Sequence, residues 1–286
     1  MAEIIDGKRV AEHIRKEVRD GVKKLKEETG IIPGLAAVLV GNNPASQIYV
    51  RNKRKACEEV GIYSEEHDLP EETTESNLLS LVERLNHDEK IHGILVQLPL
   101  PKQISEAKIL RAVSPLKDID GFHPENIGLL VEGNPRFIPC TPYGIIKLLD
   151  YYNIEIQGKE AVVVGRSNIV GKPVSILLLY RHATVTICHS RTRALPEVIR
   201  RADILVAAMG HARFITEDMV KEGAVVIDVG INRLPDGKLS GDVDFERVKD
   251  KASYITPVPG GVGPMTIGML LWNTFSSAKN LKVTGD

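Results

Sequence analysis

Apolar residues near the N-terminus recur with the spacing of a helix. Val10, Ile14, Val18, Val22 and Leu25 lie three or four positions apart, and Lys, Arg and Glu fill many of the positions between them. This spacing places the apolar side chains on one face, as in a helix that packs on a core. The pattern therefore predicts an amphipathic helix with one buried face.

Short apolar runs then alternate with further helical stretches, and turn residues such as Gly41 and Gly61 separate them. The expected strands span residues 35–40, 62–68 and 91–98, and the expected helices span residues 45–60, 75–86 and 103–113. Alternating strands and helices of these lengths predict parallel strands in a layered α/β domain.

A second alternating series follows a stretch rich in proline and glycine, residues 114–141, and begins after a helix expected at 142–152. Its expected strands span residues 161–164, 184–188, 203–207, 224–229 and 254–256. Several of these strands are nearly continuous apolar runs, which is typical of strands covered by helices on both faces.

The two series predict an α/β protein with two domains. We expect an N-terminal α/β domain over residues 1–118, a linker over 119–141 and a doubly wound Rossmann-type domain over 142–263. A final helix over about 264–286 is assigned to the first domain, although the pattern alone leaves its packing open.

Residues 161–173 have the order strand, tight turn, helix, which is typical of the first unit of a dinucleotide-binding domain. A β-branched run ends at Gly165, a polar turn with Arg166 and Ser167 follows, and Gly171 precedes the next helix. Free backbone N–H groups and the positive helix end would face an anion there. Because Ser167 stands where the usual spacing has a second glycine, an ordinary strand-to-helix turn also explains this stretch.

The end of the second strand of this series favours NADP. Residues 188–193 include Ser190 and Arg191 but no acidic residue, and cations suit the extra phosphate of NADP where an acid would suit NAD. A solvated basic loop explains the charges as well. Small residues around Ile231 would let backbone amides approach a nicotinamide, or would form a simple turn. Asp228, within an apolar run, needs a partner if it is buried.

Four polar residues of the N-terminal half are candidates for chemistry. Tyr49 and Lys53 share one helix face, Gln97 ends an apolar strand, and Asp120 precedes a glycine. A surface lysine, a glutamine bound to loop backbone and an Asp-Gly turn are the structural alternatives. In a cleft, the lysine could carry a proton and the aspartate could accept hydrogen bonds from an amino-pyrimidine. The glycine-rich segment 257–266 fits a flat ligand or a connector between domains.

Composition narrows the classes of partner. The chain has 286 residues, 26% of them charged, and a formal net charge of -1, which argues against a general binder of nucleic acid or membrane surfaces. The histidines show no metal-ligand spacing, so no metal is expected. Three scattered cysteines, with no CxxC pair and no secretory leader, favour the reducing cytoplasm.

Several sequence blocks together resemble the bifunctional methylenetetrahydrofolate dehydrogenase/methenyltetrahydrofolate cyclohydrolase family. They are SQIYVRNK at 46–53, QLPLP at 97–101, KDIDGFHP at 117–124, PCTP at 139–142, GRSNIVGKP at 165–173, CHSRT at 188–192 and PVPGGVGP at 257–264. Their order along essentially the whole chain is far more specific than any single block. The segment 211–214 looks less typical of the family and is assigned no role.

The resemblance implies a homodimer of two-domain subunits, with folate in the cleft between the domains and NADP on the second domain. It implies that Lys53 is the catalytic lysine, that Tyr49 stacks on or orients the folate, and that Gln97 positions Lys53. Asp120 would anchor the pterin. The loop residues expected to complete the folate pocket are Pro259, Gly260 and Gly261, and those expected to bind NADP are Gly165, Arg166, Ser167, Ser190, Arg191 and Ile231.

The implied chemistry is oxidation of 5,10-methylenetetrahydrofolate to 5,10-methenyltetrahydrofolate, followed by hydrolysis to 10-formyltetrahydrofolate in the same site, as part of one-carbon metabolism. Hydride transfer chiefly needs orientation, whereas the hydrolysis needs a group that moves protons, a role suited to a lysine with a shifted pKa. The alternatives are a monofunctional NADP-dependent dehydrogenase and a non-enzymatic NADP-sensing module.

Overall fold

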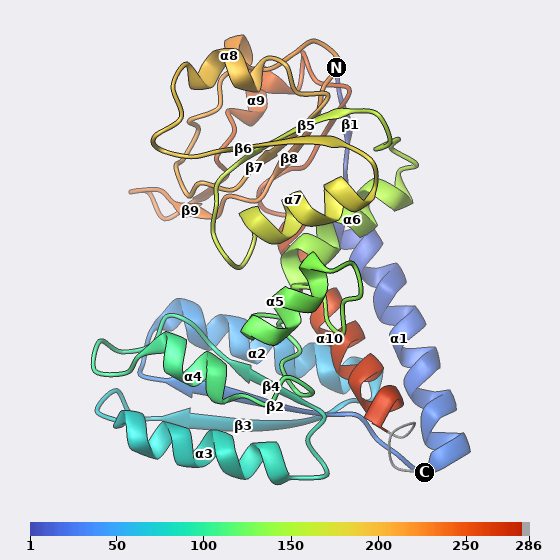
Figure 1. The fold of residues 1–286 in the computed structure, drawn as a ribbon, viewed down its shortest axis with the longest axis vertical. Helices are drawn as coiled ribbons and strands as arrows, with labels where there is room; N and C mark the ends of the chain where they lie inside the picture. Colours follow the sequence, from blue (N-terminus) through green and yellow to red (C-terminus); the bar gives the residue numbers. More distant parts are fainter. Residues whose placement is uncertain (282–286) are drawn as a thin grey trace. The chain divides into compact units, whose positions relative to one another are not determined.

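The computed structural model describes residues 1–281, except for the side chains of residues 44, 45 and 281, and the chain forms two compact units (Figure 1). The large-sheet unit comprises residues 1–12 and 141–266, and the small-sheet unit comprises residues 13–140 and the chain from Ile267. Each unit is built on a parallel sheet of its own, so the predicted α/β class is confirmed.

Helix α1, Gly7–Thr29, has the predicted amphipathic pattern. The apolar residues at its three- and four-residue spacing are all buried, namely Val10, Ile14, Val18, Val22 and Leu25. Most of the helix lies in the small-sheet unit, where Phe275 occupies the space beside Gly21. The sequence period therefore correctly identified the face of the helix that packs.

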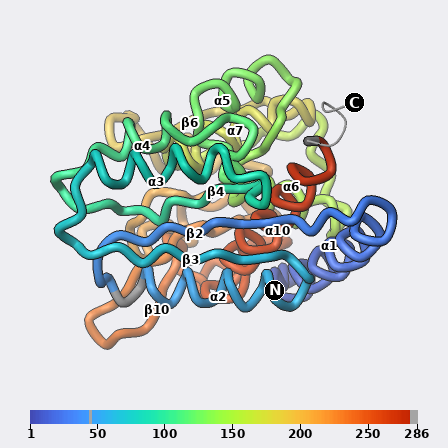
Figure 2. The backbone as a smooth tube through the Cα atoms, turned by 90° about the horizontal axis from the view of Figure 1, so that it is seen from below, coloured from blue at the N-terminus to red at the C-terminus, as the bar shows by residue number. Residues whose placement is uncertain are grey.

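The small-sheet unit contains three parallel strands in the order β3-β2-β4, with β2 between its neighbours in Figure 2. The strands are β2 Gly34–Val40, β3 Tyr63–Leu69 and β4 Gly93–Val96, and the helices of this part of the chain are α2 Pro44–Val60, α3 Glu75–His87, α4 Glu106–Ala112 and α5 Pro124–Val131. Every residue of β2 is buried, as expected for a central strand. Alternate residues of β2 pack with α3 in one core cluster.

The large-sheet unit contains six strands in the order β1-β11-β8-β7-β5-β6, all parallel. They are β1 Glu3–Ile4, β5 Glu160–Val164, β6 Thr184–Cys188, β7 Ile204–Ala207, β8 Val225–Asp228 and β11 Tyr254–Ile255. Helices α6 Cys140–Tyr151, α7 Gly171–Tyr180, α8 Leu195–Ile199 and α9 Phe245–Val248, the short 3-10 helix Glu217–Met219 and the hairpin β9 Asn232–Arg233 with β10 Leu239–Ser240 complete this part of the chain.

The strand order of this sheet reverses between β5 and β7. The chain runs from β5 to β6 on one side and then returns to β7 on the other side of β5. In open α/β sheets, ligands bind outside the carboxyl ends of the strands at such a reversal. The strand order therefore points to the loops after β5 and β7 as the binding region.

Two parts of the fold differ from the sequence expectation. Strand β1 pairs with β11, so the first 12 residues belong to the large-sheet unit rather than to the N-terminal domain. Residues 119–140 belong to the small-sheet unit, and the expected linker contains helix α5. That helix begins after the N-cap His123, with Pro124 at its first position, where proline is well tolerated.

Helix α10, Val262–Leu281, starts near the expected position, and residues 282–286 of the expected helix lie outside the described residues. In the small-sheet unit, Asn273 Nδ2 donates to the carbonyls of Ile119 at 2.8 Å and Ile138 at 3.0 Å. Ser277 Oγ donates to the carbonyl of His92 at 2.6 Å. In residues 1–281, no helix has the length and apolar character needed to cross a membrane.

Candidate active site

Lys53 and Gln97 are bonded to each other in the small-sheet unit. Lys53 lies on α2, which follows β2, and Gln97 follows the last residue of the neighbouring strand β4. Lys53 Nζ donates to Gln97 Oε1 at 3.1 Å, and Gln97 Nε2 donates to the carbonyl of Leu98 at 2.7 Å. The second bond fixes the orientation of the amide, so that its oxygen faces the lysine.

Asp120 supplies the opposite charge to this pair. Burial lowers the pKa of Lys53 below its ordinary value, and the charge of Asp120 is the largest effect that opposes this shift. Burial likewise raises the pKa of Asp120, and the charge of Lys53 opposes it. The predicted residues Lys53, Gln97 and Asp120 therefore form one cluster in which both ionisable groups have shifted proton affinities, a common property of catalytic sites.

Cys140 is a further member of this cluster. Its thiol is buried and donates to the carbonyl of Ile119 at 3.5 Å and to Asp120 Oδ1 at 3.7 Å. Burial, followed by the charge of Asp120, raises the pKa of Cys140 well above its ordinary value, so the group is a neutral thiol. The sequence analysis quoted the PCTP block but gave this cysteine no role.

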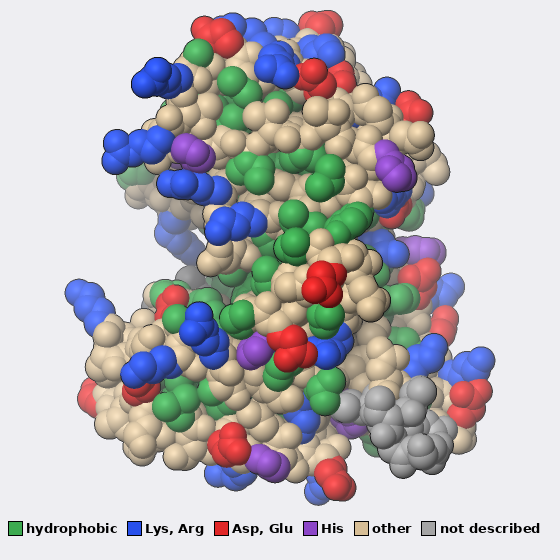
Figure 3. Space-filling model, in the orientation of Figure 1, with side chains coloured by type: hydrophobic (Ala, Val, Ile, Leu, Met, Phe, Trp, Pro, Cys, Tyr) green, Lys and Arg blue, Asp and Glu red, His purple; other side chains and the backbone are tan. Residues whose placement is uncertain are grey.

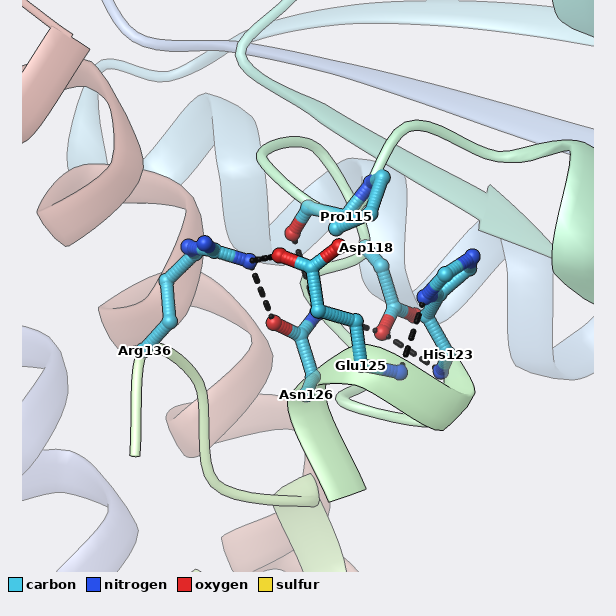
Figure 4. A network of polar contacts seen from close by, with 6 residues as sticks. All are labelled: Pro115, Asp118, His123, Glu125, Asn126 and Arg136. Atoms are coloured by element: carbon cyan, nitrogen blue, oxygen red, sulfur yellow. Dashed lines mark hydrogen bonds and ion pairs between the residues drawn. The ribbon is translucent and has the colours of Figure 1, made fainter. Parts of the chain in front are cut away.

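The loop that carries Asp120 is held by the buried carboxylate of Asp118, as Figure 4 shows. Asp118 Oδ2 accepts hydrogen bonds from His123 N at 2.7 Å and Asn126 Nδ2 at 2.8 Å, and Oδ1 accepts one from Phe122 N at 3.2 Å. These bonds close the chain around Asp118, so the backbone on both sides of Asp120 is fixed.

Arg136 braces the same network. Its Nη1 donates to Asn126 Oδ1 at 2.9 Å and to Glu125 Oε1 at 2.7 Å (Figure 4). Asn126 is fully buried, and its Nδ2 also donates to the carbonyl of Pro115 at 2.9 Å. Because the Asn126 amide uses both its oxygen and its nitrogen, it links Arg136 to Asp118.

Tyr49 lies one helical turn before Lys53 on α2. The tyrosine is 41% exposed, whereas Lys53 is only half-buried on the same helix face. Its ring is therefore available to stack on a flat ligand beside the cluster.

The turn after β5 in the large-sheet unit fits close backbone packing around an anion. Gly165 has φ of 136°, and a Cβ there would overlap the carbonyl oxygen of Ala208 after β7. A Cβ on Gly171 would overlap the carbonyl of Gly165. Both positions therefore require glycine, which lets the N-terminus of α7 approach the ends of β5 and β7.

Ser167 replaces a glycine in this turn and acts as a local brace. Its Oγ accepts from Val170 N at 3.1 Å and Gly171 N at 3.2 Å. The hydroxyl proton remains able to donate to a bound group. The departure from the usual glycine spacing thus keeps a helix N-terminus of the kind that binds phosphate.

Exposed basic residues accompany this turn. Arg166, Ser190 and Arg191 are all exposed, and the loop after β6 is shaped by a bond from Arg191 N to His189 Nδ1 at 3.1 Å. In Figure 3 blue side chains gather on the side of this unit that carries the β6 loop and the β9–β10 hairpin. No acidic residue stands between 188 and 193, as the sequence shows.

The remaining predicted residues also belong to the large-sheet unit. Ile231 follows β8 and is 51% exposed. Pro259 follows a cis peptide bond, Gly260 has φ of 110°, and Gly261 N donates to the carbonyl of Pro257 at 2.8 Å. These residues form an ordered loop before α10.

The large-sheet unit also contains two buried aspartates, Asp228 at the end of β8 and Asp242 after β10. Asp228 was expected to need a partner, and its carboxylate accepts from Gly230 N, Asp242 N and Val243 N, each at 2.9 Å. Asp242 had no recognisable signal in the sequence. Among residues 1–281, no cluster of three or more His, Cys, Asp or Glu could hold a metal ion.

Taken together, the strand reversal with its glycine turn and the cluster of Lys53, Gln97 and Asp120 define a dinucleotide-dependent enzyme with a separate group of ionisable side chains. Comparison with known proteins gives the particular family. Residues 5–120 match the catalytic domain of tetrahydrofolate dehydrogenase/cyclohydrolase, and residues 139–282 match the NAD(P)-binding domain of the same enzymes. The chain therefore belongs to the bifunctional tetrahydrofolate dehydrogenase/cyclohydrolase family.

Individual relatives agree with this assignment over their full length. The bifunctional protein FolD of Pelobacter propionicus is 61% identical over 279 residues, which are 98% of each chain. The crystal structure of the Campylobacter jejuni FolD enzyme has a TM-score of 0.96 and 52% identity, covering 98% of this chain and 100% of that one. The Trypanosoma brucei enzyme, solved with NADP and an inhibitor, has a TM-score of 0.94 and 41% identity, covering 98% of each chain.

Proposed function

We propose that the chain oxidises 5,10-methylenetetrahydrofolate with NADP and then hydrolyses the methenyl product to 10-formyltetrahydrofolate, with both steps served by the Lys53 cluster. The observation that carries this proposal is the bond from Lys53 Nζ to Gln97 Oε1 beside the half-buried Asp120. A half-buried lysine whose pKa is lowered gives up its proton more readily than a solvated lysine, which suits a group that accepts and returns protons.

The oxidation step needs little acid–base help from the protein. When bound, NADP supplies the acceptor for the hydride that leaves the methylene carbon, and the two folate nitrogens stabilise the cation that forms. The task of the chain is therefore orientation. Tyr49 is proposed to stack on the folate, and the ionised form of Asp120 is proposed to accept hydrogen bonds from the pterin.

The hydrolysis step is where Lys53 is proposed to act. Water attacks the methenyl carbon and loses a proton, one folate nitrogen must then accept a proton as its bond to that carbon breaks, and the second proton of the water leaves to solvent as the formyl C=O forms. Lys53 in its neutral form can take the first proton and return it to the nitrogen. Gln97 accepts a hydrogen bond from Nζ and so holds the amine in place.

The NADP site is proposed to be the turn after β5 with the loop after β6. Gly165, Ser167 and the start of α7 would hold the pyrophosphate, and Arg166, Ser190 and Arg191 would hold the extra phosphate. Ile231, in the loop after β8, would line the nicotinamide end of the cofactor. Pro259, Gly260 and Gly261 would complete the folate pocket.

A homodimer in the cytoplasm is also part of the proposal. Strand β6 ends the sheet order, and Leu179 and Ile187 near it are 55% and 42% exposed. Exposed apolar side chains on an edge strand and on the helix before it, α7, suit pairing with a second copy. The three cysteines are free and buried, which suits a reducing compartment.

The test of Lys53 separates the two activities. Lys53→Met should reduce decay of methenyltetrahydrofolate, followed by its absorbance, by at least about a hundredfold, because general acid–base catalysis supplies about that much. Lys55→Met, an exposed lysine of the same helix, is the matched control and should retain full activity. Full cyclohydrolase activity in folded Lys53→Met would contradict the assigned role.

The alternatives make different predictions for the wild-type protein. A monofunctional dehydrogenase would accumulate methenyltetrahydrofolate without accelerated decay, and a sensing module would bind NADP without turnover. NADPH formation together with rapid methenyl decay supports the bifunctional reaction. Replacing NADP with NAD in the same assay measures the proposed preference.

A further inference from the structure

Asp242 is fully buried and lies beyond the hairpin that follows β8. Its carboxylate accepts four hydrogen bonds, all from N–H groups. Oδ2 accepts from Met209 N at 2.7 Å and Gly210 N at 3.0 Å, and Oδ1 accepts from His211 N at 2.8 Å and Asn232 Nδ2 at 2.9 Å. One side chain thus gathers the segment after β7 and the segment after β8.

The surrounding backbone leaves no room for another arrangement. A Cβ on Gly230 would overlap Asp242 Oδ1, and a Cβ on Gly241 would overlap Asp228 Oδ2. The backbone of Asp242 is fixed as well, because its N–H donates to Asp228 Oδ1 at 2.9 Å and its carbonyl accepts from Ile215 N at 2.9 Å. The carboxylate is therefore held at one position, with its lone pairs directed at the two loops.

These loops lie at the carboxyl ends of adjacent strands, since β7 pairs with β8. The segment 209–211 continues from Ala208, whose carbonyl packs against Gly165 at the strand reversal. Ile231, proposed to line the nicotinamide end of NADP, lies between Gly230, which packs against the Asp242 carboxylate, and Asn232, which donates to it.

We propose that Asp242 is a positioning residue for the cofactor, which holds the loops after β7 and β8 in the form that binds the nicotinamide half of NADP. This inference rests on the proposed NADP site. Only a carboxylate can fill the position, because it offers acceptor sites to all four donors, whereas an amide presents an NH2 group to two N–H groups. Losing those bonds leaves buried donors without partners and lets both loops move.

The test compares Asp242→Asn with Asp203→Ala. Asp203 also holds backbone, accepting from Glu160 N at 2.9 Å, but it lies at the opposite end of the same sheet. We expect Asp242→Asn to raise the Kd for NADP, measured by calorimetry, by about tenfold. The KM for NADP should rise by the same factor, which corresponds to a loss of about 1.4 kcal/mol of binding free energy. The Asp203→Ala variant should keep the wild-type Kd for NADP.

The cyclohydrolase assay supplies the second readout, because hydrolysis of methenyltetrahydrofolate without NADP uses the Lys53 cluster of the other unit. It should be unchanged in Asp242→Asn, so a folded variant with a selective NADP defect supports the inference. If Asp242→Asn does not fold, Asn232→Ala removes one of the four donors, and the Kd for NADP should rise about twofold to threefold.

A wild-type Kd for NADP in folded Asp242→Asn would overturn the inference, and so would an unchanged Kd in Asn232→Ala where the first variant does not fold. An equal loss of NADP binding and of cyclohydrolase activity would overturn it as well, because the defect would then be general. Arg166→Ala shows whether a wild-type Kd in Asp242→Asn means that the role of Asp242 is wrong or that the proposed NADP site is wrong. If Arg166→Ala weakens NADP binding and Asp242→Asn does not, only the role of Asp242 is wrong.

Discussion

Replacing Asp118 by asparagine should change how the stability of the protein depends on pH. Burial raises the pKa of Asp118 from 3.8 to about 7, although hydrogen bonds from Asn126, His123 and Phe122 lower it in part. The folded protein therefore retains a proton that the unfolded chain has released between about pH 4 and pH 7. Because the unfolded chain binds fewer protons in this range, the free energy of unfolding falls as the pH rises.

The size of the effect follows from the two pKa values of Asp118, 3.8 and about 7. They differ by about three units, and each unit corresponds to about 1.4 kcal/mol. The wild-type protein should thus lose about 4 kcal/mol of stability through this group as the pH rises from below 4 to above 7. The asparagine variant has no proton to lose there, so this part of its pH dependence should be absent.

Urea unfolding followed by circular dichroism, from about pH 4.5 to pH 8, measures the difference. The free energy of unfolding of wild type minus that of Asp118→Asn should fall by several kcal/mol over this range. Asp20→Asn, an exposed position on α1, controls for the loss of one surface carboxylate. Parallel curves for wild type and Asp118→Asn would refute the raised pKa and with it the described burial of the carboxylate.

Two further substitutions test the backbone that supports each site, namely the turn after β5 and the segment that carries Asp120. Gly165→Ala should weaken NADP binding at least tenfold and lower the free energy of unfolding by about 1–3 kcal/mol, because φ is 136° and a Cβ would overlap Ala208. Calorimetry measures the binding and urea unfolding measures the stability. Unchanged NADP binding would contradict the proposal that this turn is the cofactor site. Asn273→Ala should cost about 2–3 kcal/mol of stability and lower cyclohydrolase activity, since it loses the bonds to Ile119 and Ile138 beside Asp120; Lys279→Ala, exposed on the same helix, should change neither.

Periodic patterns predicted most of the regular structure. The helical spacing of α1 and the continuous apolar runs of β5 and β7 each reflect burial of one element, which the sequence records locally. Helix α5 escaped prediction because its Pro124–Val131 span is short and lies in a stretch rich in turn residues. Strand β1 escaped because two residues carry no period, and its place depends on pairing with β11.

The features of the candidate site likewise fall into those that the local sequence predicts and those that depend on tertiary structure. Lys53 and Tyr49 could be related by helix geometry, and Gln97 by its place at a strand end, but the bond between Lys53 and Gln97 depends on the pairing of β2 with β4. The shift in the pKa of Asp120 depends on burial, which no local pattern records. Asp242 gave no signal because its donors lie on two other segments, 10 and 31–33 residues before it in the sequence.

Both units use a buried carboxylate to organise the loops beyond a strand end. Asp118 gathers the loop around Asp120, and Asp242 gathers the loops after β7 and β8. A carboxylate is suited to this because it accepts several N–H groups at once, whereas a hydroxyl or an amide offers fewer acceptor sites. Its desolvation is costly, so such a group persists where loop position matters more than stability. If each carboxylate serves to position loops, replacing Asp118 should weaken folate binding more than NADP binding, and replacing Asp242 should weaken NADP binding more than folate binding.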